Sequence, residues 1–297
     1  MKDRSRELEM LHETLQILEQ GFYEKNGRKV QLKLSRSEME EAKVIMPNDV
    51  WDTSSRPEFE PPFVMGRCGI GCENRDSFAV ARERAAEKHQ FGNNAQNVLV
   101  LNMANPVNPG GGVRRGAKAQ EEDLCRTSSL LLSLEGKQAK EYYKYNKSLH
   151  TYMGSDALMI TPQVEIIRDE NGELLDDTVI VSVVTCAAPM AIYGKEGLTN
   201  DEYEDMIYER MTGLMKCTSY HGYRKIVLGA WGCGAFGNDA AFIADLFDQV
   251  LKEMTYNRRT LKDLFSRVDF AVLDRTRDQY NFKQFHRKFT YDNFYSM

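Results

Sequence analysis

The feature that most constrains the fold is a regular alternation of short apolar strands with helices, which begins near residue 63 of this 297-residue chain. The spacing of the apolar residues predicts each element. We expect strands within 63–70, 97–104, 156–169, 173–188, 224–231 and 267–274, and a turn at Asn171-Gly172. Helices are expected at 77–89, 120–134, 201–220 and 239–254. Strands that alternate with helices predict an α/β sandwich built on a parallel or mixed sheet.

The first 62 residues have a different pattern. Leucines at helical spacing within residues 4–20, followed by Gly21, predict a helix. We interpret residues 1–62 as an N-terminal extension packed on the main domain, residues 63–297, so that the chain forms a single domain overall.

Charge and composition exclude several classes of protein. The chain has 44 acidic and 39 basic residues, a net charge of -5, which argues against general nucleic-acid binding. No apolar run approaches the length of a membrane span, and the first residues carry no secretory signal, so we expect a cytoplasmic protein that does not enter a membrane. The six cysteines and five histidines show no ligand spacing, so we predict no metal and no cofactor.

The first of two glycine-rich loops follows the strand at 97–104 and precedes a helix. Ligands of open α/β sheets bind at the carboxyl ends of strands, where such loops lie. The three consecutive glycines Gly110, Gly111 and Gly112 have no Cβ, so their backbone N–H groups can approach a ligand or form an anion-binding nest.

Two glutamates, Glu121 and Glu122, open the helix after this loop. Neighbouring carboxylates repel each other, which raises the pKa of one of them, while the positive helix N-terminus acts in the opposite direction. The sequence does not decide between these effects. Acidic residues are also common in a first helical turn for dipole reasons alone, and a glycine run can be a simple flexible connection.

The second glycine-rich loop follows the strand at 224–231. Gly232, Gly234 and Gly237 form a GxGxxG pattern, and Asn238 is a natural N-cap for the next helix. Backbone amides here could hold a pyrophosphate. A dinucleotide-binding dehydrogenase is a rival interpretation, but its motif belongs to the first strand and needs an acid about 20 residues later. The first such acid, Asp274, is 37 residues past Gly237.

The order GGG, seven residues, then QEE resembles the catalytic motif of poly(ADP-ribose) glycohydrolases, above all the bacterial type. The preceding Asn102-Met-Ala-Asn105 is similar to the Asn-rich strand end of macrodomains. The resemblance extends from the N-terminal helix to the last strand. It implies a macrodomain-like three-layer α/β/α sandwich with a mixed sheet, extended by an N-terminal helical part and a C-terminal part, with residues 63–297 as the catalytic domain.

The resemblance also implies roles for residues. Glu122 would be the general acid that protonates the leaving ribose oxygen and then the base that activates water, while Glu121 and Asn105 would hold ribose hydroxyls. Phe236 would pack against the distal ribose, next to the diphosphate. The full set of expected substrate-binding residues is Asn105, Gly110, Gly111, Gly112, Val113, Gln120, Gly232, Cys233, Gly234, Ala235, Phe236 and Asn238.

The function implied is hydrolysis of the ribose–ribose bonds of poly(ADP-ribose) on modified proteins, with release of ADP-ribose. We expect cleavage from the polymer end, because the aromatic segment 280–295 could cover one rim of the pocket. The alternatives are a hydrolase of single ADP-ribose units on protein or nucleobase, and a module that binds ADP-ribose without cleaving it. An intact QEE argues against the last.

Overall fold

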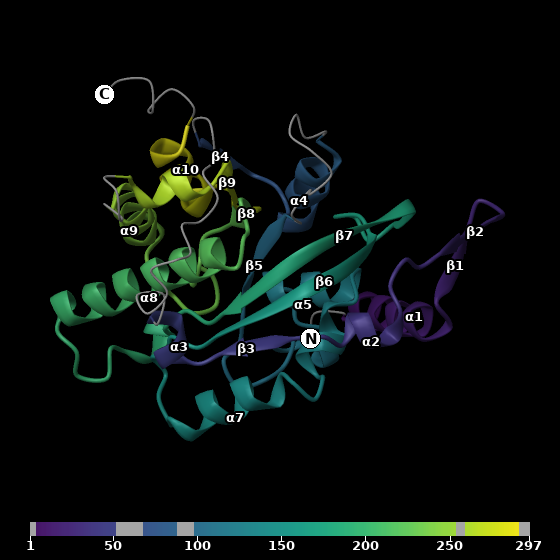
Figure 1. The fold of residues 1–297 in the computed structure, drawn as a ribbon, viewed down its shortest axis with the longest axis horizontal. Coiled ribbons are helices and arrows are strands. Elements are labelled where there is room, and N and C mark those ends of the chain that lie inside the picture. Colours follow the sequence, from purple (N-terminus) through teal and green to yellow (C-terminus); the bar gives the residue numbers. More distant parts are fainter. Residues whose placement is uncertain (1–3, 52–67, 88–97, 254–258, 291–297) are drawn as a thin grey trace.

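A seven-stranded mixed sheet forms the centre of the molecule (Figure 1). The computed structural model describes residues 4–51, 68–87, 98–253 and 259–290. The strand order is β3-β6-β7-β5-β8-β9-β4; β7, β5, β8, β9 and β4 run parallel, and β6 runs antiparallel to β7 and β3. The strands are β3 (Lys43–Ile45), β4 (Gly69–Glu73), β5 (Leu99–Met103), β6 (Leu158–Arg168), β7 (Leu174–Cys186), β8 (Lys225–Leu228) and β9 (Arg267–Ala271).

Helices cover both faces of this sheet. Along β5 the side chains alternate, so Leu99 and Leu101 pack in one apolar cluster and Val100 in another. The first cluster also holds residues of α8 (Asn200–Tyr220), α9 (Ala240–Lys252) and α10 (Tyr280–Lys288). The second holds residues of α1 (Ser5–Gln20), α4 (Ser77–Ala86), α5 (Gln120–Thr127), α6 (Leu130–Leu134) and α7 (Lys140–Ser148). The predicted three-layer α/β/α sandwich with a mixed sheet is confirmed.

The N-terminal region is joined closely to this core. After α1 come the hairpin β1 (Phe22–Lys25) and β2 (Arg28–Gln31), α2 (Arg36–Met39), β3, and α3 (Pro47–Trp51). Strand β3 is an edge strand of the main sheet, paired with β6. The domain division at residue 62 stays a prediction, and residues 63–67 of the expected first strand lie outside the described residues. The helix expected at 120–134 is two helices, because Ser128 has an extended backbone that interrupts it.

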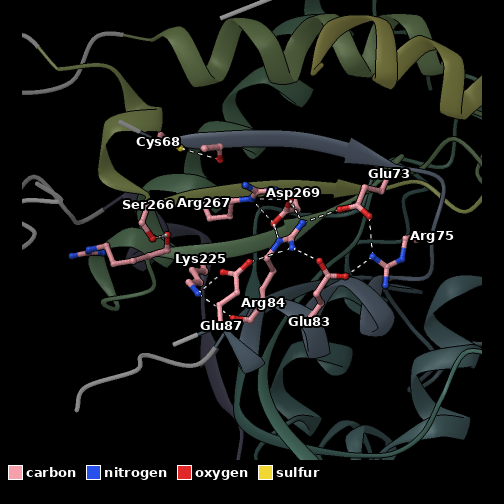
Figure 2. A network of polar contacts seen from close by, with 12 residues as sticks. Cys68, Glu73, Arg75, Glu83, Arg84, Glu87, Lys225, Ser266, Arg267 and Asp269 are labelled. Carbon is pink, nitrogen blue, oxygen red and sulfur yellow. Dashed lines mark hydrogen bonds and ion pairs between the residues drawn. The ribbon is translucent and has the colours of Figure 1, made fainter. Parts of the chain in front are cut away.

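A buried ionic network fixes α4 against the sheet (Figure 2). The guanidinium of Arg84 on α4 donates to Asp269 of β9 (Nε–Oδ2 2.9 Å) and to Glu73 of β4 (Nη2–Oε1 2.8 Å). Asp269 has only 2% of its side chain exposed and also accepts from Arg267. Removing one partner of such a network leaves a buried charge uncompensated, which is strongly destabilising. The network therefore holds the last turn of α4 against β4 and β9.

No helix within the described part of the chain is both long enough and apolar enough to cross a membrane.

Candidate active site

The two glycine-rich loops enclose a cavity of about 260 Å³. It lies at the carboxyl ends of the strands, where the first loop leads from β5 to α5 and the second from β8 to α9. Among its described lining residues, Lys118 is the one basic side chain. The lining consists of Asp76, Ser77, Met103, Lys118, Ala119, Gln120, Asp123, Ala188, Ala230, Gly232, Gly234, Ala235, Phe236, Ala271, Val272, Leu273 and Asn281.

Gln120 ties the first turn of α5 to the end of β5. Its Oε1 accepts from the backbone N–H of Met103 (2.9 Å), and its Nε2 donates to the carbonyl of Leu101 (2.7 Å) and to Ser77 Oγ (3.2 Å). The amide thus replaces a neighbouring strand at this point. The Gln120 amide positions the two glutamates that follow it, and the side chain also lines the cavity.

Glu121 is 3% exposed and lies behind the end of β5. Its Oε2 accepts from the backbone N–H of Asn105 (2.8 Å), and its Oε1 lies 3.4 Å from the Asn102 amide Nδ2. Burial raises the pKa of Glu121 to about 8, although the N–H of Asn105 acts in the opposite direction. The desolvation effect therefore outweighs the hydrogen bonds, which favours the neutral form of Glu121.

Glu122 joins α5 to the first loop. Its Oε1 accepts from the N–H of Gly112 and its Oε2 from the N–H of Ala119, both at 2.7 Å. The residue is 7% exposed. Each carboxylate oxygen has two acceptor positions, so one remains on each oxygen for a substrate hydroxyl or a water.

Both carboxylates converge on Gly111. A Cβ added there would lie 2.4 Å from Glu122 Oε1 and 2.9 Å from Glu121 Oε2, and Gly111 has φ of +58°. A side chain at this position is therefore excluded by both contact and backbone conformation. The glycine run makes room for the carboxylate pair, which does not itself line the described cavity but lies beneath the loop beside it.

The second loop is held from within by Asn238. Its Oδ1 accepts from Tyr203 Oη (2.6 Å), and its Nδ2 donates to the carbonyl of Pro189 (2.8 Å). The prediction that Asn238 caps α9 is wrong: Asp239 is the N-cap and accepts from the N–H of Phe242. Because Asn238 is enclosed by these partners, its side chain supports the loop from behind.

Other residues of the second loop face the cavity. Gly232, Gly234, Ala235 and Phe236 line it, and a Cβ added at Gly234 would meet nothing within 4 Å. Cys233 is half-buried, and its thiol donates to the carbonyl of Trp231 (3.6 Å). The open space at Gly234 is where a ligand can approach the backbone.

The structure thus divides the predicted substrate-binding residues. The cavity is lined by five of them: Gln120, Gly232, Gly234, Ala235 and Phe236. The glycines of the first loop instead face side chains of the protein itself. The side chain of Val113 is 1% exposed and lies in the apolar core, and Asn105 Oδ1 accepts from the backbone N–H groups of Val107 and Asn108.

Several lining residues had no signal in the sequence. Asp76 caps α4 by accepting from the N–H groups of Phe78 and Ala79, and burial raises its pKa. Lys118 forms an ion pair with Glu7 of α1. Lys118 lines the cavity together with its neighbours Ala119 and Gln120, and the position of Asp76 after a strand was a usable hint.

The start of α10 forms part of the rim. Asn281 lines the cavity, and Tyr280 Oη donates to Asp239 Oδ2 (2.9 Å). Further along, Phe285 and Phe289 are fully buried, and the Phe289 ring stacks on Phe270 with centroids 4.0 Å apart. The helix is therefore anchored to the core, while residues 291–295 of the expected cover lie outside the described residues.

A profile of the catalytic domain of microbial-type PARG, the poly(ADP-ribose) glycohydrolases, matches residues 12–169, which is more than half of the chain. The chain belongs to this family. The matched residues include the first glycine-rich loop and the QEE turn. No curated protein sequence matches the chain.

Solved PARG structures have the same fold. PARG from Thermomonospora curvata is 28% identical, with a TM-score of 0.85 over 96% of this chain and 100% of that one. The same enzyme bound to the inhibitor ADP-HPD is 29% identical, with a TM-score of 0.82 over 96% of this chain and 100% of that one. A T267R mutant of PARG from Deinococcus radiodurans, in complex with ADP-ribose, is 31% identical, with a TM-score of 0.74 over 87% of this chain and 98% of that one. The predicted family, fold and glycohydrolase activity are confirmed; the roles of single residues stay predictions.

Within the described residues no three His, Cys, Asp or Glu side chains are grouped so that they could hold a metal ion.

Proposed function

We propose that this PARG hydrolyses the ribose–ribose O-glycosidic bond of the terminal unit of poly(ADP-ribose) on modified proteins and releases ADP-ribose, with Glu122 as the general acid and base. The observation that carries the proposal is the convergence of Glu121 and Glu122 on Gly111, beside a cavity whose opposite wall is the second loop. The proposed acid follows the end of β5 and the proposed binding surface follows the end of β8, so the fold brings the two together.

The second loop suits the diphosphate of ADP-ribose. Gly232 and Gly234 expose backbone to the cavity, and the loop leads directly into the N-terminus of α9. Lys118, which also pairs with Glu7, contributes a positive charge from the opposite wall. ADP-ribose in the Deinococcus complex and ADP-HPD in the Thermomonospora complex support this class of ligand. Phe236 would then pack against the distal ribose.

The chemistry follows from the positions of the carboxyl groups. Glu122 gives a proton to the oxygen that leaves as the bond to the anomeric carbon breaks, and an oxocarbenium-like centre develops. Glu122, now ionised, takes a proton from the attacking water, which restores the acid. The N–H groups of Gly112 and Ala119 hold its two oxygens in place.

Glu121 has a different task. A neutral carboxyl group donates one hydrogen bond and accepts others, so it can hold a ribose hydroxyl without placing a second full charge beside Glu122. Burial raises the pKa of Glu121 to about 8, which favours the neutral form that this role needs. The substrate's own diphosphate supplies negative charge near the developing cation.

The rim formed by α10 supports cleavage from the polymer end. Internal units of the polymer carry a further link on the adenosine-side ribose, and they need an open groove there. We place the adenosine-side ribose at this rim, where Asn281 and Leu273 line the cavity and the buried Phe285 anchors α10 to the core.

A product time course tests the proposal. The protein is incubated in EDTA with poly(ADP-ribose) and, separately, with mono-ADP-ribosylated protein. Free ADP-ribose is expected from the polymer from the first time points, without long oligomers. An early appearance of long oligomers contradicts terminal cleavage, and release from the mono-modified protein alone would identify a mono-ADP-ribosyl hydrolase. Loss of activity that zinc or magnesium restores would reveal a metal-dependent mechanism.

A further inference from the structure

Two exposed tyrosines form a tilted ring pair near the second loop. Tyr152 is 50% exposed and Tyr193 is 59% exposed, yet their ring centroids are 4.4 Å apart with an interplanar angle of 33°. The neighbouring Ile192 is 63% exposed. Exposed apolar side chains are common when scattered singly, but a contiguous group of this kind indicates a binding surface.

The pair is held in place by hydrogen bonds between two separate connections. Tyr152 belongs to the α7–β6 connection and Tyr193 to the β7–α8 connection, which lie side by side in Figure 1. Glu196 accepts from the backbone N–H of Tyr152 (2.8 Å) and from Thr151 Oγ1 (2.5 Å). The N–H of Met190 donates to the carbonyl of Tyr152 (2.9 Å). The two rings are therefore preorganised by bonds that do not involve them.

The pair adjoins the catalytic cavity. The backbone N–H of Ile192 donates to the carbonyl of Phe236 (3.0 Å), and a Cβ added at Gly237 would lie 3.2 Å from Ile192. The connection that carries Tyr193 thus packs directly on the second loop, beside the residue assigned to the distal ribose. The tyrosine pair is therefore connected to the second loop through Ile192.

We infer that the tyrosine pair binds the adenine of the next ADP-ribose unit, the one that remains on the polymer after cleavage; this rests on the proposed function. The bond that breaks joins the distal ribose to the adenosine ribose of that next unit. An adenine therefore lies beyond the distal ribose, on the side where the tyrosines are. Flat exposed aromatic rings are the surface on which nucleic-acid bases stack, and stacking needs the ring rather than the hydroxyl.

The experiment compares two double variants. Tyr152→Ser with Tyr193→Ser removes both rings, whereas Tyr152→Phe with Tyr193→Phe keeps the rings and removes the hydroxyls. Calorimetry measures binding of ADP-ribose and of a fragment of two linked ADP-ribose units, in a Glu122→Gln background that slows cleavage. Turnover of poly(ADP-ribose) is measured with Glu122 intact.

With both rings present, the two-unit fragment is expected to bind about 5- to 100-fold more tightly than ADP-ribose, the scale of one base–aromatic stack. The serine pair should lose this advantage and raise KM for the polymer by a similar factor, with ADP-ribose binding unchanged. The phenylalanine pair should behave like the native protein.

Equal binding of the fragment and of ADP-ribose to the native tyrosines overturns the inference, whether or not the protein is active. So does a loss of ADP-ribose binding in the serine pair, because the rings would then only support the second loop. Failure to release ADP-ribose from polymer with the tyrosines intact counts against the proposed function alone.

Discussion

The two glycine-rich loops look alike in the sequence and differ in the structure. In the first loop, the space that a side chain would fill at Gly111 is occupied by the carboxylates of Glu121 and Glu122. In the second, the space at Gly234 is empty and opens on the cavity. Glycine therefore makes room for two carboxylates in one loop and leaves open space at the cavity in the other, so we expect substitutions at the two sites to change different measured quantities.

The largest effect is expected from Glu122→Gln. The amide keeps the size of the side chain but cannot give and take back a proton, so kcat should fall by about 10²–10⁴-fold while ADP-ribose still binds. Glu141→Gln, on the exposed side of α7, is the matched control and should be neutral. Turnover near the native value in Glu122→Gln would remove Glu122 from the mechanism.

The next effect is a dependence of the free energy of unfolding on pH that comes from Glu121. Burial raises the pKa of Glu121 from 4.5 to about 8. Between these two values the folded protein binds more protons than the unfolded chain, so this group's contribution to the free energy of unfolding is full below pH 4.5 and decreases as pH rises toward 8.

The slope from this group is at most about 1.4 kcal/mol per pH unit. Denaturant titrations between pH 5 and 8 should show a clearly flatter pH dependence in Glu121→Gln, whose side chain stays neutral. Identical slopes in the native protein and the variant would mean that Glu121 ionises normally in its buried position.

Much of this site follows from local sequence. The GGG and QEE spacing was sufficient to place the loop before the helix, because a strand, a glycine run and a helix start are read from consecutive residues. The turn at Asn171-Gly172 also formed as predicted, with Gly172 at φ +89°. The raised pKa of Glu121 could not be predicted from the sequence, because the burial of Glu121 depends on the packing of α5 against β5.

The wrong prediction for the N-cap of α9 also arose from a contact between distant elements. Asn238 and Asp239 are equally good N-caps locally, and the choice is made by Tyr203 of α8, which donates to Asn238. Likewise, the pairing of Lys118 with Glu7 of α1 is not indicated by the sequence near Lys118. The role of a residue cannot be predicted from motif spacing when that role depends on contacts with an element distant in sequence.

A smaller effect is expected from Gly111→Ala. The added methyl group would meet Glu122 Oε1 at 2.4 Å, and the residue needs a positive φ. We expect a loss of about 1–3 kcal/mol in the free energy of unfolding, and a kcat lower by about 10²-fold because the acid is displaced by about 1 Å. Gly27→Ala, at φ +72° with nothing within 4 Å, separates backbone strain from contact. Equal destabilisation by the two variants would mean that contact with the carboxylates adds nothing.

The smallest change in stability is expected from Gly234→Ala. Gly234 does not have a positive φ, and its surroundings are empty, so the free energy of unfolding should stay within about 0.5 kcal/mol of the native value. ADP-ribose binding should weaken about tenfold, because the methyl group enters the ligand's space. Calorimetry with unchanged affinity would show that no ligand atom lies against Gly234.

The most direct test of the difference between the loops is to measure kcat on poly(ADP-ribose) and Kd for ADP-ribose side by side in Gly111→Ala and Gly234→Ala. The predicted result is a crossed pattern: Gly111→Ala lowers kcat with little change in Kd, and Gly234→Ala raises Kd with little change in kcat at saturating polymer. If both variants change the same quantity, the two loops do not divide catalysis and binding between them.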